Sequence, residues 1–118
     1  MIRLLGFALL AVATMALVQP TLADNAMACD KGPLKRDFGK SQWLVYGCAD
    51  HLSLAFVSRP GSPAFPFYFF LSVTDGAMHL TGEGTGSKAA TDAAYQDLTG
   101  ITDDKRQEIL DEIDRLTP

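Results

Sequence analysis

The chain has 118 residues and a formal net charge of −4 at pH 7, with 47% hydrophobic and 20% charged residues. A chain of this size is expected to make one small domain, because two independent cores of half the length would each be marginally stable. The excess of acidic residues argues against nucleic acid as a partner, since binding it needs a basic surface that releases phosphate counterions.

Residues 1–23 have the pattern of an export signal. Arg3 provides the positive start, residues 4–18 are almost continuously apolar, and small residues precede Asp24. This run is shorter than the roughly 20 apolar residues that a membrane span needs, and no later segment approaches that length. We therefore predict cleavage after Ala23, no stable membrane span, and a mature protein in the periplasm, with secretion as the alternative.

Residues 24–40 are polar and contain Gly32, Pro33 and Gly39 without helical or strand periodicity, so we predict an irregular N-terminal arm. The arm carries four cations that could dock on the acidic C-terminal helices, although a solvated arm is the commoner outcome. These cations are Lys31, Lys35, Arg36 and Lys40.

Cys29 and Cys48 are the only cysteines, and both follow the predicted cleavage site. Disulfides form and persist in the compartments that exported proteins reach. Because the spacing is not that of a C-x-x-C redox pair, we predict one structural disulfide that tethers the arm and stabilises the fold by roughly 3 kcal/mol. The alternatives are a free or metal-bound cysteine pair, and a lipid-modified Cys29, which would leave Cys48 without a partner.

Residues 41–118 are predicted to form a single α+β domain. Four segments rich in β-branched and aromatic residues are separated by turn signals, which indicates a four-stranded antiparallel meander. The strongest signal is Asp75-Gly76, because a two-residue hairpin turn requires positive φ angles. The expected strands are 42–48, 52–58, 67–74 and 77–81, with a proline-rich loop at 59–66.

Two helices are predicted after the sheet, packed on one of its faces. The segment 88–98 is rich in alanine, with Ala94 and Leu98 on one face, and Gly100 ends it. Thr102 can cap a second helix. The buried stripe of that helix is expected to contain Ile109, Leu110, Ile113 and Leu116.

Alternation along the strands places apolar residues on both faces of the predicted sheet. Two short helices cover one face only, so the other needs the arm, a ligand or a second subunit. The run 65–71 is typical of a central strand, but surplus aromatic side chains on the uncovered face would contact a partner protein or a small apolar ligand. Phe65 and Tyr68 are the candidate partner-binding residues.

The glycine-rich segment 82–88 lies between the last predicted strand and the first predicted helix, where backbone N–H groups could hold an anion. It matches neither a Walker A loop nor a dinucleotide-binding fingerprint. The ordinary interpretation is a flexible connection in which Thr85 or Ser87 caps the helix. The candidate anion-binding residues are Gly84, Gly86, Ser87 and Lys88.

The sequence contains no recognisable catalytic or metal-binding pattern. His51 and His79 have no partner at metal-ligand spacing, and Asp75 and Glu83 are only loosely placed for a glycosidase-type pair. We therefore expect no catalytic residues, no metal and no cofactor. The leading hypothesis is a small exported, non-catalytic binding or interaction protein. The alternatives are an anion-binding protein or enzyme that uses the Gly82–Lys88 loop, and a structural homodimer.

Overall fold

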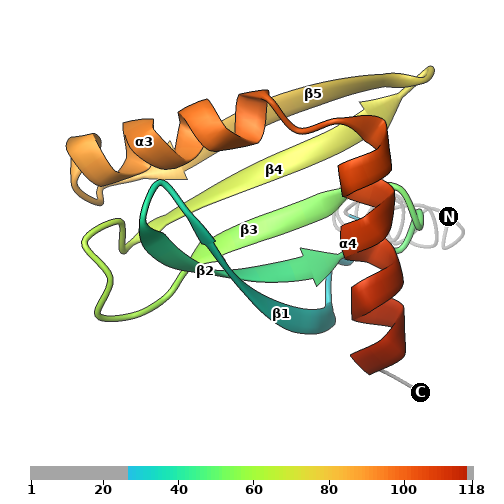
Figure 1. Ribbon diagram of the computed structural model, residues 1–118, viewed down its shortest axis with the longest axis horizontal. Coiled ribbons are helices and arrows are strands. Elements are labelled where there is room, and N and C mark those ends of the chain that lie inside the picture. The colour runs from blue at the N-terminus through green and yellow to red at the C-terminus, as the bar shows by residue number, and fades with distance from the viewer. Residues whose placement is uncertain (1–26, 117–118) are drawn as a thin grey trace, which may run out of the picture.

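The structure is a computed structural model that describes residues 27–116. Its strands form one antiparallel sheet in which neighbours in sequence are neighbours in space, and both helices lie on the same face of it (Figure 1). The elements are β1 (Lys31–Phe38), β2 (Ser41–Gly47), β3 (Leu54–Ser58), β4 (Phe67–Thr74), β5 (Ala77–Gly84), α3 (Lys88–Thr99) and α4 (Asp103–Leu116). The predicted α+β class with two helices is confirmed. The predicted export signal at 1–23 lies outside the described residues.

The sheet has five strands, so the prediction of four was wrong. The additional strand is β1, which lies inside the segment that we expected to be irregular. Leu34 and Phe38 pack against the core while Lys35 is exposed, but a charged residue, Arg36, holds the core-side position between them and hides the alternation. Gly39 and Lys40, both with positive φ, make the two-residue turn into β2.

The core lies between the sheet and the two helices. Trp43 and Phe56 are fully buried in it, and Phe38 meets Phe56 edge to face with ring centroids 5.4 Å apart. Helix α3 contributes Ala94 and Leu98, as its spacing predicted. Helix α4 contributes Ile109, Leu110 and Ile113.

The buried surface of α4 includes Arg106 but not Leu116, which we had expected there. Leu116 is exposed at the end of the helix, whereas Arg106 is buried. The Arg106 guanidinium donates a hydrogen bond to the carbonyl oxygen of Leu52 at 2.9 Å and another to the Asp103 carboxylate at 3.3 Å. The bond to Leu52 joins α4 to the connection between β2 and β3, and the bond to Asp103 lies within the first turn of α4.

The connection between β2 and β3 is longer than predicted, because Asp50 folds it into a turn. The Asp50 carboxylate accepts hydrogen bonds from the amides of Leu52 and Ser53 and from the Ser53 hydroxyl, at 2.6 to 2.9 Å. Burial alone would raise the pKa of Asp50, but these hydrogen bonds to its charged form outweigh burial and lower the pKa. As a result, β3 begins at Leu54, and Leu52 is exposed rather than part of a strand.

A disulfide joins Cys29 to Cys48, as the sequence predicted. It links the segment before β1 to the residue after β2, and the Ala49 amide donates to the carbonyl oxygen of Ala28 at 2.7 Å beside it. Within residues 27–116, no helix is long and apolar enough to cross a membrane.

Candidate functional site

The face of the sheet opposite the helices is the candidate functional site, and we call it the open face. Antiparallel pairing aligns its side chains in rows that run across the strands. Its middle is apolar, and the side chains there are half-buried or exposed rather than covered. The apolar members are Leu44 and Tyr46 of β2, Ala55 and Val57 of β3, and Tyr68 and Phe70 of β4.

Phe65 and Tyr68, the two residues singled out from the sequence, line the same apolar hollow of about 370 Å³ at one end of the open face. The two residues are 44% and 45% exposed. Val57 and Pro66 form part of the same wall. The Tyr68 hydroxyl donates a hydrogen bond to the carboxylate of Glu83, its cross-strand neighbour on β5, at 3.3 Å.

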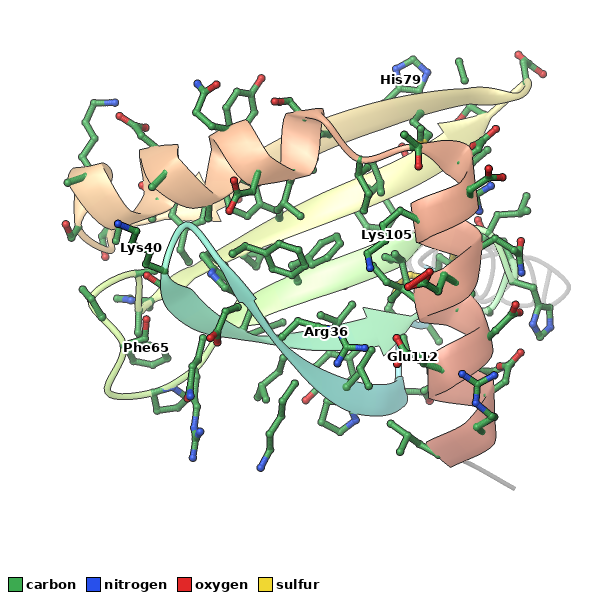
Figure 2. The ribbon with its side chains drawn as sticks, viewed as in Figure 1. Arg36, Lys40, Phe65, His79, Lys105 and Glu112 are labelled. Atoms are coloured by element: carbon green, nitrogen blue, oxygen red, sulfur yellow. A yellow bond between two sulfur atoms is a disulfide. The ribbon has the colours of Figure 1, made fainter. Side chains whose placement is uncertain are left out.

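The loop that carries Phe65 is held firmly against the sheet. Ala64 is fully buried. The amides of Thr85 and Gly86 both donate to the carbonyl oxygen of Pro66, at 2.9 and 3.0 Å. In Figure 2, Phe65 lies at the loop end of the molecule, away from α4. Its exposed ring is therefore placed before any partner arrives, which reduces the entropy lost on binding.

The glycines of segment 82–88 allow this close packing. The segment is therefore not the flexible connection that we expected. Gly82 and Gly84 continue β5, and Gly84 has φ of +143°. A Cβ atom on Gly86 would stand 1.8 Å from the carbonyl oxygen of Ala64, so only glycine allows the two backbones to approach this closely. We predicted that Thr85 or Ser87 caps the helix; the cap is Ser87, whose hydroxyl accepts a hydrogen bond from the Ala90 amide.

The candidate anion-binding residues come together only in part. Gly84, Gly86 and Lys88 line a hollow of about 340 Å³ beside α3, but Asp92 lines it as well. The Lys88 ammonium pairs with the Asp92 carboxylate at 3.1 Å. The amides of residues 85–87 donate to carbonyl oxygens of the loop 63–66, and Ser87 caps the helix. The geometry therefore does not favour an anion at this position.

The segment before β1 covers one part of the open face. Met27 and Cys29 line a second hollow of about 400 Å³ together with Ala55, Phe70 and, again, Tyr68. Tyr68 thus forms part of the walls of two hollows, one towards Phe65 and one towards Met27. The sequence left open whether the arm covers this face. In the structure residues 31–38 extend the sheet instead, and only the residues before them reach over it.

The cations of the predicted arm have different surroundings. Arg36 forms an ion pair with Glu112 of α4, and Figure 2 shows the two side chains meeting between β1 and the helix. Lys31 lies 3.3 Å from the imidazole of His51. Lys35 and Lys40 are exposed and form no ion pair with any residue of the described chain. Only one of the four cations therefore docks on an acidic helix.

Among residues 27–116, no group of three or more His, Cys, Asp and Glu side chains is placed so that it could hold a metal ion. Compared with models of protein families, with curated proteins and with solved structures, the chain matches none of them.

Proposed function

We propose that the protein is a small exported, non-catalytic interaction protein that binds another protein through the open face, with Phe65 and Tyr68 as its anchoring side chains. The observation that carries this proposal is the apolar hollow that these two exposed aromatic side chains both line. A disulfide in a small domain is consistent with export.

The free energy that Phe65 and Tyr68 are expected to contribute to binding follows from their exposed area. Fully burying a large apolar side chain stabilises by roughly 1.5 to 3 kcal/mol, and nearly half of each ring is still exposed at 44% and 45%. Covering both rings would then contribute about 2 kcal/mol, which corresponds to roughly 30-fold in affinity. This is about 1 kcal/mol for each ring, a level that fewer than about 30% of interface residues exceed when they are truncated.

Position-specific photocross-linking tests this proposal, because the chain offers a matched control. Tyr95 on α3 is 43% exposed, close to the 45% of Tyr68, but lies on the helical side of the sheet. We expect Tyr68→benzoylphenylalanine to give a protein adduct in the cells that make the protein, and Tyr95→benzoylphenylalanine to give none. Adducts of equal yield at both positions, or none at position 68, would contradict the proposal.

Competition measures the energy of the same contact. Purified unlabelled protein should reduce the adduct at position 68, and the double variant Phe65→Ser/Tyr68→Ser should need about 30-fold more protein to do so. Both side chains are already exposed, so the variant is expected to fold. Equal competition by the two proteins would show that the rings do not anchor the partner.

A further inference from the structure

The open face contains a row of side chains whose charges are arranged antisymmetrically. Antiparallel pairing places Lys35 beside Leu44, Leu44 beside Val57, Val57 beside Tyr68, and Tyr68 beside Glu83. The row therefore begins with a cation on β1, passes through three apolar or aromatic residues, and ends with an anion on β5. Neighbouring strands are about 4.8 Å apart, so the two charges are separated by about 19 Å.

Neither charge is satisfied within the described part of the chain. Lys35 and Glu83 are both exposed, and neither takes part in an ion pair among residues 27–116. Glu83 accepts only the 3.3 Å hydrogen bond from Tyr68. Each charge is thus free to meet a partner that approaches the open face.

We infer that the partner bound by the open face is a second copy of this chain, and this inference rests on the proposed function. A two-fold axis parallel to the strands and above Val57 would reverse the order of the row in the second copy. Lys35 of each copy then faces Glu83 of the other, while Leu44 faces Tyr68 and the two Val57 side chains meet at the axis. The row from Lys35 to Glu83 is its own electrostatic complement under this operation, as a two-fold interface requires.

Two sheets packed face to face lie about 10 Å apart with their strands within about 30° of each other, so the side chains at the two ends of the row can meet. Met27 and Cys29 stand over the part of the face near Ala55 and Phe70. The row from Lys35 to Glu83 and the hollow at Phe65 are the parts that remain open to a second copy.

Charge reversal tests the two-fold arrangement. Lys35→Glu and Glu83→Lys each replace two attractive contacts per dimer by two repulsive ones, so each variant alone should dimerise about tenfold more weakly than the unchanged chain at low ionic strength. An equimolar mixture of the two variants restores both attractive contacts. We therefore expect sedimentation equilibrium to show a heterodimer at least as tight as the original dimer. Lys40→Glu, the same charge change in the β1–β2 turn, should have no effect.

The outcomes separate this inference from the proposed function. A chain that is monomeric at all concentrations, or a mixture that associates no better than each variant alone, would overturn the second copy as occupant. If the adduct at position 68 then has a mass other than twice that of the chain, the proposed function stands with a different partner. If position 68 gives no adduct either, both fail. Circular dichroism of each variant establishes that these exposed substitutions leave the fold intact.

Discussion

The variant Gly86→Ala is expected to be less stable than the unchanged protein by about 3 kcal/mol, the upper range for overpacking a tightly packed site. The added Cβ would stand 1.8 Å from the carbonyl oxygen and 2.4 Å from the carbonyl carbon of Ala64. Both are backbone atoms, so no side-chain rotation relieves the clash. The loop 63–66 must move away from β5, and the hydrogen bonds between Pro66 and the amides of residues 85 and 86 are then lost.

Urea denaturation of the two proteins measures this effect. Gly100→Ala is the matched control, because a Cβ atom there would meet nothing closer than the Asp97 carbonyl oxygen at 3.8 Å and φ is −91°. The control should change the free energy of unfolding by less than about 0.5 kcal/mol. Since the same loop carries Phe65, Gly86→Ala should also weaken binding at the open face. Equal stability of the Gly86 and Gly100 variants would mean that the loop does not pack as described.

Removing the disulfide should lower the free energy of unfolding by a similar amount. The cysteines are 19 residues apart in sequence, and closing a loop of that length stabilises by about 3 kcal/mol on the chain-entropy model. For a domain of this size each kcal/mol corresponds to roughly 4 to 8 °C, so Cys29→Ala/Cys48→Ala should melt about 12 to 24 °C lower. Thermal unfolding followed by circular dichroism gives this shift directly.

Reduction provides an independent control for the disulfide. A reducing agent should lower the melting temperature of the unchanged protein to about that of the double variant and should leave the double variant unaffected. The bridge also holds Met27 and Cys29 over the open face, so its loss uncovers the hollow near Phe70. A melting temperature that reduction does not alter would contradict a stabilising role for Cys29 and Cys48.

The parts of the fold that could be predicted are those with a local physical cause. The turn at Asp75-Gly76 has positive φ at both residues, as its composition indicated. The caps at Ser87 and Thr102 form because each hydroxyl oxygen accepts a hydrogen bond from the amide three residues later. Strand β1 could not be predicted from local features in the same way. Its alternation includes Arg36, whose core-side position makes sense only once α4 brings Glu112 to it.

The candidate site also has a part that could be predicted from the sequence and a part that could not. Phe65 and Tyr68 stood out because aromatic residues exceed what one covered face of a small sheet can bury. The role of the glycines at 82–86 could not be predicted, because it depends on the loop 63–66 returning to lie against β5. The row from Lys35 to Glu83 was also hidden, since it requires the register of four strand pairings at once.

The central claim is that the open face is a protein-binding surface. Comparing the hydroxyl-radical oxidation of Tyr68 with that of Tyr95 tests this claim most directly. The two rings are 45% and 43% exposed in the isolated chain, so they should be oxidised at similar rates in dilute purified protein. In the compartment where the protein works, the account predicts that oxidation of Tyr68 falls severalfold while oxidation of Tyr95 is unchanged. Tyr68 oxidised there as fast as Tyr95 would contradict it.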